Sequence, residues 1–322
     1  MLPLKKSIFV VLFSLSTSLL SSCSADSSIK QIRATLFLLD GSKSLASTDN
    51  FSTKEQQLKE RLTQAFKKKE AIYFDFIRND YSKQEILALI SMKSILNVNN
   101  EIVKYAKNKD VRTETEELVS DLWEQALLDS RSVDVCIKEV DAKLEINAVN
   151  PWGTKIVAQN LCIGANKAKE TFSRIKVITS GQTLENGYIG SDVEGAFEKG
   201  FGVLESLSNN LFNDDGTKVF VQATIVVSSD MMQRNSSGEK VIDKIRNMSD
   251  EQISDYILKE KGETKLRTLT PDVYVDGWAN TKKNYSEKDR DTLEAYWKKW
   301  FEHLGAKEPD FGFGVIDWSV DQ

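Results

Sequence analysis

Short apolar segments alternate with amphipathic helical segments along this chain, and this alternation limits the possible folds more than any other feature. Residues 32–39 form a short apolar run that ends at a turn, which is typical of a buried strand. The next segment predicts a helix, because Ser52 and Glu55 form a capping-box pair and apolar residues recur every four positions over 58–66. Residues 71–77 are aromatic and β-branched and predict a second strand. Strand, helix and strand in this order indicate an α/β sheet.

The same alternation returns in the second half of the chain. Helices are expected at 190–207, from the Ser249–Gln252 capping pair onward and from Ser286 to Gly305, and strands at 219–230, 272–278 and 311–317. The strand at 219–230 has a continuous apolar section, as a central parallel strand does. The aromatic stripe of the last helix is expected to pack in the core. Together these segments predict a three-layer, doubly wound, mostly parallel α/β sheet.

The segment between these two halves predicts helices and no strand. Ser82 and Glu85 form a capping pair before an apolar run, and the sequence at 150–153, NPWG, separates two further helical patterns. Cys136 and Cys162 lie at similar distances on either side of that break, so an antiparallel helical hairpin would bring them together. We therefore expect an all-helical insertion with a Cys136–Cys162 disulfide. Two buried free thiols are the alternative.

The amino-terminal segment has the order of a secretory signal. Two lysines precede an apolar stretch at 8–20, which ends in Leu-Ser-Ser-Cys23. This ending resembles the lipobox of bacterial lipoproteins, which implies cleavage before Cys23 and diacylglycerol on its sulfur. Ser24, rather than Asp, then implies sorting to the outer membrane, facing the periplasm. An ordinary signal peptide with a chance cysteine is the alternative.

The composition is that of a soluble globular body. The chain has 322 residues, 28% of them charged, and its formal net charge of −5 becomes −7 without the first 22 residues, which hold two lysines and no acid. An acidic body argues against nucleic acid as the main partner. The expected organisation is a signal peptide at 1–22, a lipid-anchored tether at 23–30, an α/β domain in two parts at 31–80 and 177–322, and the helical insertion at 81–176.

Three oxygen-bearing side chains follow the first strand at alternate positions. Asp40, Ser42 and Ser44 stand in LFLLDGSKS, where a parallel strand would deliver them to the ligand-binding edge of the sheet. One explanation is a turn. The other is a hard cation such as Mg²⁺, which takes oxygen ligands and usually keeps several waters.

LFLLDGSKS resembles the first motif of von Willebrand factor A-type domains, in which an apolar strand runs into Asp-x-Ser-x-Ser. Two further segments fit the family: Gly190-Ser191-Asp192, with Ser191 where Thr is usual, and Asp230 at the end of TIVVSSD. The resemblance implies a metal-ion-dependent adhesion site that holds Mg²⁺ or Mn²⁺ and binds a carboxylate of a partner protein. Its ligands would be Asp40, Ser42, Ser44, Ser191 and Asp230. Ser191 also fits a capping pair with Glu194, and Lys43 lies inside the first motif.

The sequence gives little support for an enzymatic function. His303 is the only histidine, and it lies near the end of the aromatic helix, so a Ser-His-Asp triad or a zinc site has few candidates. No glycine-rich phosphate loop is present. We expect a non-enzymatic envelope protein that acts in binding, adhesion or complex assembly. The alternatives are a metal-free scaffold acting through the helical insertion and, third, an unrecognised hydrolase.

Overall fold

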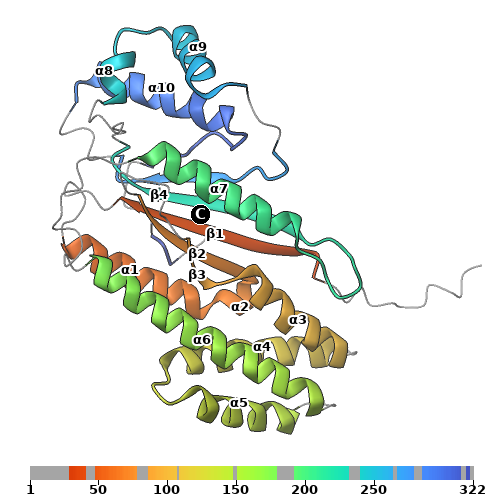
Figure 1. Ribbon diagram of the computed structural model, residues 1–322. Helices are drawn as coiled ribbons and strands as arrows, with labels where there is room; N and C mark the ends of the chain where they lie inside the picture. Colours follow the sequence, from red (N-terminus) through yellow and green to blue (C-terminus); the bar gives the residue numbers. More distant parts are fainter. Residues whose placement is uncertain are drawn as a thin grey trace, which may run out of the picture.

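The computed structural model describes residues 29–40, 48–77, 86–106, 109–147, 151–179, 192–231, 240–263, 267–278, 285–312 and 317–319. Within these ranges the chain forms an α/β fold with five strands and ten helices (Figure 1). The strands are β1 (Gln31–Asp40), β2 (Glu70–Ile77), β3 (Leu87–Ile90), β4 (Phe220–Ser228) and β5 (Asp272–Asp276). The helices are α1 (Thr48–Thr63), α2 (Ala65–Lys68), α3 (Met92–Tyr105), α4 (Lys109–Leu128), α5 (Val133–Asn147), α6 (Pro151–Thr179), α7 (Val193–Asn209), α8 (Val241–Ile245), α9 (Asp250–Lys261) and α10 (Glu287–His303).

The five strands form one mixed sheet in the order β3-β2-β1-β4-β5. β1 pairs in parallel with both β2 and β4, and β4 pairs in parallel with β5. Only β3, at one edge, is antiparallel to its neighbour. The expectation of a mostly parallel α/β sheet is therefore confirmed.

The side chains of β1 alternate between the two faces of the sheet, as the two-residue period of a strand requires. Leu36 and Leu38 face α7, which approaches so closely that Gly200 has no room for a Cβ atom beside Leu36. Phe37 points to the opposite face, where the Arg61 guanidinium of α1 lies 5.5 Å from its ring. Helices thus cover both faces of the central strand, and β1 is buried along most of its length.

An aromatic cluster joins α10 to α7 on the first of these faces. The rings of Phe197 and Phe301 have centroids 4.5 Å apart, and Trp300 packs edge-on against both. Trp297, Trp300 and Phe301 are fully buried. The expected core role of the aromatic stripe is confirmed, and apolar burial of this size is the main force holding α10 in place.

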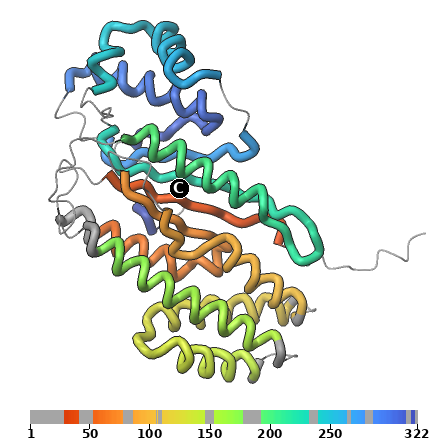
Figure 2. Tube along the Cα trace, viewed as in Figure 1, coloured from red at the N-terminus to blue at the C-terminus, as the bar shows by residue number. Residues whose placement is uncertain are grey.

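Helices α3–α6 gather on the α1 side of the sheet (Figures 1 and 2). We call them the helical block. Trp123 of α4 joins the block to α1 and α2: its Nε1 donates to the Leu62 carbonyl at 2.8 Å, and its ring centroid lies 5.0 Å from that of Phe66. Cys136 of α5 and Cys162 of α6 form a disulfide with a Cα–Cα distance of 5.9 Å. The predicted pairing is confirmed.

The apolar run at 86–90 was predicted to be helical, and this prediction is wrong. Residues 87–90 form β3, which pairs with Ile72, Tyr73 and Phe74 of β2. A five-residue apolar run fits a buried strand and a buried helix equally well, and here the open edge of β2 decides the outcome. The sheet therefore extends into the segment that was assigned to the helical insertion.

Two helix starts also differ from prediction. α1 begins at Thr48, one turn before the Ser52–Glu55 pair, because Thr48 to Asn50 are themselves residues that favour a helix start. α7 is capped by Asp192, whose carboxylate accepts from the Gly195 N–H at 3.0 Å, one residue after the start of the predicted Ser191–Glu194 pair; Ser191 itself lies outside the described residues.

The expected last strand at 311–317 is not seen in the part of that segment that the structure describes. Residues 311, 312 and 317 have no strand conformation, and only Asp310 makes an isolated parallel bridge, to Tyr274. The remaining residues, 313–316, lie outside the described ranges. None of the described helices combines the length and apolar character that a membrane-spanning segment needs.

Candidate functional site

The carboxyl ends of β1 and β4 lie side by side and carry two buried acids. Asp40, the last residue of β1, has 3% of its surface exposed. Since Leu39 pairs with Ser228, Asp40 lies next to Ser229, and Asp230 follows directly. Asp230 is also buried. Two acids predicted as site residues thus come from distant parts of the chain to one edge of the sheet.

Ser229 connects the two strand ends. Its hydroxyl donates to Asp40 Oδ2 at 2.9 Å and accepts from the Met231 N–H at 3.0 Å. Met231 has a φ of 56°, which turns the chain sharply after Asp230. Its carbonyl accepts from Trp297 Nε1 of α10 at 3.1 Å. The turn that carries Asp230 is therefore tied to β1 on one side and to the aromatic core on the other.

A third buried acid, Asp276, ends β5 at the same edge. Its carbonyl accepts from the Ser229 N–H at 2.8 Å, and its carboxylate pairs with the Lys54 ammonium of α1. Lys54 is only 5% exposed and lies 5.0 Å from the Trp318 ring. Burial lowers the pKa of Lys54, and the attraction of Asp276 opposes that change. Sequence reasoning missed this pair. Asp276, near the end of the predicted strand at 272–278, was a usable signal, whereas nothing local marked Lys54.

The other predicted ligands have no described position. Ser42, Ser44 and Ser191, together with Lys43, lie outside the described residues, as does the predicted lipidation site Cys23. Ser191 directly precedes Asp192, the cap of α7.

The first turn of α7 is held by a buried polar cluster. Tyr296 Oη of α10 donates to Glu194 Oε1, and Lys261 Nζ of α9 lies 2.6 Å from Glu194 Oε2. Burial, with the adjacent Glu194 carboxylate, raises the pKa of Tyr296 well above its ordinary value. Burial lowers the pKa of Lys261, but the charge and hydrogen bond of Glu194, together with the charges of Glu198 and Asp192, outweigh it and raise the pKa. This cluster fixes the helix end that follows Ser191.

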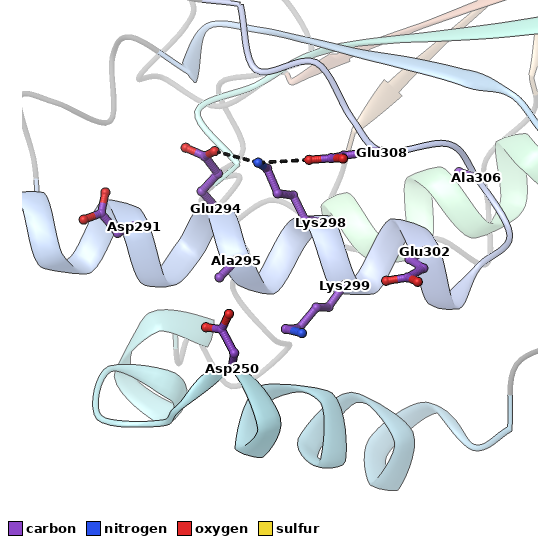
Figure 3. Close-up of a pocket in the computed structure, with 9 residues that line it drawn as sticks. All are labelled: Asp250, Asp291, Glu294, Ala295, Lys298, Lys299, Glu302, Ala306 and Glu308. Atoms are coloured by element: carbon purple, nitrogen blue, oxygen red, sulfur yellow. Dashed lines mark ion pairs between the residues drawn. The ribbon is translucent and has the colours of Figure 1, made fainter.

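A groove of about 620 Å³ lies between α9 and α10 (Figure 3). Lys298 Nζ lies between Glu294, at 3.2 Å, and Glu308, at 3.0 Å. The groove is lined almost entirely by charged side chains: Asp250, Asp291, Glu294, Lys298, Lys299, Glu302 and Glu308. Its lining residues come from outside the strand ends, and we assign it no part in the candidate site.

The side chains of Asp40, Ser229 and Asp230 at the strand ends offer only oxygen atoms as metal ligands, which suits a hard divalent cation. Across the ranges that the structure describes, no three His, Cys, Asp or Glu side chains are grouped to hold a metal ion. The predicted ligand set contains only two acids, Asp40 and Asp230; its other members are serines.

His303, the only histidine of the chain, is partly buried, and burial lowers its pKa.

Comparison with known proteins identifies no relative. No protein-family model, no curated protein and no solved structure matches this chain. Any assignment of function therefore rests on the residues themselves and on their arrangement at the strand ends.

Proposed function

We propose that this chain is a membrane-anchored envelope protein whose domain resembles the von Willebrand factor A type and binds a partner protein through a metal ion. The observation that carries the proposal is the joint position of Asp40 and Asp230 at the ends of two neighbouring parallel strands. The partner would supply a carboxylate to the ion, as the resemblance implies. Cys23 would carry the lipid.

The strand order supports this location. From β1 the chain moves to β2 on one side, whereas β4 and β5 extend the sheet on the other side. In a doubly wound sheet, ligands bind outside the carboxyl ends of the strands where the order reverses, which here lies between β1 and β4. In this interpretation α1 and α7 belong to the two outer layers, and the helical block is an insertion between β3 and α7.

The formal charge at the strand ends supports a divalent ion. Asp40, Asp230 and Asp276 are buried acids, and the Lys54 ammonium is paired with Asp276. Among the described residues, these three carboxylates exceed the single ammonium, and a divalent cation would offset the excess of negative charge. Because Lys54 holds Asp276, we assign the ion to Asp40 and Asp230, with Ser42, Ser44 and Ser191 as further oxygen ligands.

Metal titration tests the proposal. An ion that binds the native but not the unfolded chain raises the melting temperature, by an amount that grows with ion concentration over Kd. We expect Mg²⁺ and Mn²⁺ to raise it in the wild type, and Asp40→Ala and Asp230→Ala to abolish the rise. Ser42→Ala should reduce it, because a hydroxyl holds a hard cation less strongly than a carboxylate.

The control is Asp214→Ala, because Asp214 is an exposed acid in the loop between α7 and β4. It should leave the metal-induced rise unchanged. If millimolar Mg²⁺ and Mn²⁺ change neither the melting temperature nor the heat of titration of the wild type, the metal site is absent. The serine-containing motif after β1 would then be only a turn.

A second candidate function, a metal-free scaffold, is favoured by one surface of the helical block. Val135, Ile156 and Ile163 of α5 and α6 are exposed apolar side chains. Ile156 and Ile163 are seven residues apart and share a helix face. Under this function, capture of a partner from solubilised membranes would persist with a chelator and be lost in Ile156→Ser/Ile163→Ser. Under the metal-dependent function, the chelator alone would release the partner.

A further inference from the structure

Two exposed aromatic side chains lie at the opposite end of the sheet from the candidate metal site. Phe212 is 49% exposed and Phe220 is 67% exposed. Phe220 begins β4, and Phe212 lies in the segment that joins α7 to β4. Exposed phenylalanines are costly in water, and two close together on a surface indicate a contact with something apolar.

The local pairing places these two side chains on one side of the chain. Phe212 bridges Lys218 in antiparallel fashion, and the Val219 N–H donates to the Leu211 carbonyl at 3.0 Å. Residues directly opposite in such a pair share a face, and so do residues two apart along a strand. Phe212, Lys218 and Phe220 therefore project from the same face, while Leu211 and Val219 are buried.

This surface adjoins the first described residues of the chain. The Phe220 N–H donates to the Lys30 carbonyl at 2.9 Å, and Asn213 Nδ2 donates to the Ile29 carbonyl, also at 2.9 Å. The six residue-to-residue steps from Cys23 to Ile29 can span at most about 20 Å when the chain is fully extended. A lipid on Cys23 would therefore hold this end of the sheet close to the bilayer.

We propose that Phe212, Lys218 and Phe220 form a membrane-contacting surface that lies against the bilayer in which the lipid of Cys23 is inserted. The inference rests on the lipid anchor of the proposed function. The aromatic rings would enter the interfacial region, and the Lys218 ammonium would reach the phosphate groups. Asp214 and Asp215 are exposed in the same segment and offset the charge of Lys218, so the contact depends on aromatic burial more than on anionic lipid.

This surface sets the orientation of the whole domain. β1 runs from Gln31, beside Phe220, to Asp40 at the candidate metal site (Figure 1). Ten strand residues span about 33 Å, so the metal site would face away from the membrane. A partner protein could then reach it without displacing lipid.

Photo-crosslinking in the full-length protein tests the inference. A photoreactive phenylalanine analogue is placed at Phe212 or Phe220, and at the matched exposed apolar positions Leu128 and Leu258, which lie on α4 and α9. The proteins are placed in vesicles of phosphatidylethanolamine and phosphatidylglycerol. We expect cross-links to phospholipid at 212 and 220, several-fold above those at 128 and 258. All four positions are exposed, so the replacements leave the core intact.

The outcomes separate this inference from the anchor on which it rests. A protein that floats with the vesicles but cross-links to lipid equally at all four positions, or at none, overturns the membrane-contacting surface alone. A protein whose Cys23 carries no lipid and which stays in the soluble fraction overturns the anchor and the surface together. Cross-links from 212 and 220 to another protein in native membranes, in place of lipid, also overturn the inference.

Discussion

At the scale of single residues, the ion pair between Lys54 and Asp276 supports the candidate site most directly. It lies under Trp318, which shields it from water, and the Trp318 N–H is held by Gln57 of α1 at 3.2 Å. For a buried ion pair, the free energy lost in desolvating the two charges is about as large as the free energy gained from their attraction. The main effect of the pair is therefore to fix the positions of the two side chains. Through Asp276 it holds the backbone of Ser229, which in turn holds the Asp40 carboxylate.

Removing the ammonium of Lys54 should leave the Asp276 carboxylate buried without that ion pair. We therefore expect Lys54→Met to lower the free energy of unfolding by about 3 kcal/mol. The double variant Lys54→Met/Asp276→Leu should recover most of that loss, because it removes both charges and keeps apolar volume. Urea unfolding followed by circular dichroism measures both. A double variant as unstable as the single one would show that packing, and not charge, is what Lys54 contributes.

At the scale of elements, α7 and β1 depend on close contact at one helix position. A Cβ atom on Gly200 would overlap Cδ2 of the buried Leu36, whereas a Cβ atom on Gly202 would meet nothing within 4 Å. Two glycines of one helix therefore have opposite roles: Gly200 permits the helix to lie on the sheet, and Gly202 only adds flexibility.

The two glycines provide a matched pair of variants. Gly200→Ala should lower the free energy of unfolding by about 1 kcal/mol, because overpacking against Leu36 exceeds the gain in helix propensity. Gly202→Ala should raise it by up to about 1 kcal/mol, because only the propensity term remains. Thermal and urea unfolding measure the two. If both alanines stabilise the protein equally, Leu36 moves aside without cost and the close contact has no energetic role.

The polar cluster at the start of α7 predicts a dependence on alkaline pH. The folded-state pKa of Tyr296 is raised above its ordinary 10.0, so the stability it contributes is present below pH 10 and falls as the pH rises above it. Lys261, with its pKa raised above 10.5, acts in the same direction: its contribution is lost as the pH rises through the folded value.

Tyr296→Phe isolates this effect. At about pH 8 this substitution should lower the free energy of unfolding by about 2 kcal/mol, the contribution of a hydrogen bond to a charged group. At about pH 11 the cost should shrink, because the wild type loses the contribution of Tyr296 and the variant has none to lose. Urea unfolding of both proteins at the two pH values gives the difference. A cost that stays constant with pH would mean that Tyr296 titrates alike in the folded and unfolded chains.

At the scale of the whole molecule, the disulfide lies within the helical block, on one side of the sheet (Figure 1). Cys136 and Cys162 are 26 residues apart, and their bond joins α5 to α6. Closing a loop of this length removes chain entropy from the unfolded state. Cys136→Ala/Cys162→Ala should therefore lower the free energy of unfolding by about 3 kcal/mol.

The measurement is urea unfolding with and without reductant. Reductant should destabilise the wild type and leave the double variant unchanged. Metal-induced stabilisation, if present, should be the same in both proteins, because α4 and α6 lie between α5 and the sheet (Figure 1). A wild type whose two thiols are alkylated in the native, unreduced protein would contradict the bond itself.

The sequence by itself determined the parts of the fold that follow from local periodicity. Four of the five strands, the three long helices of the second half and the hairpin that pairs Cys136 with Cys162 were predictable, because each is encoded within its own segment. The positions of Asp40 and Asp230 at strand ends were predictable for the same reason. Their metal-binding role remains a prediction, carried by the resemblance and the oxygen chemistry.

Only the tertiary structure decided the rest, because it depends on contacts between residues far apart in the chain. The apolar run at 86–90 forms β3 because it pairs with the edge of β2. Asp276 entered the strand-end cluster because β5 pairs with β4, and Lys54 joined it because α1 packs beneath the sheet. Glu194, suited by sequence to a helix cap, is instead buried beside Tyr296, which comes from more than a hundred residues away. No local pattern encodes such a partner, so the charge balance of the site became visible only in the folded chain.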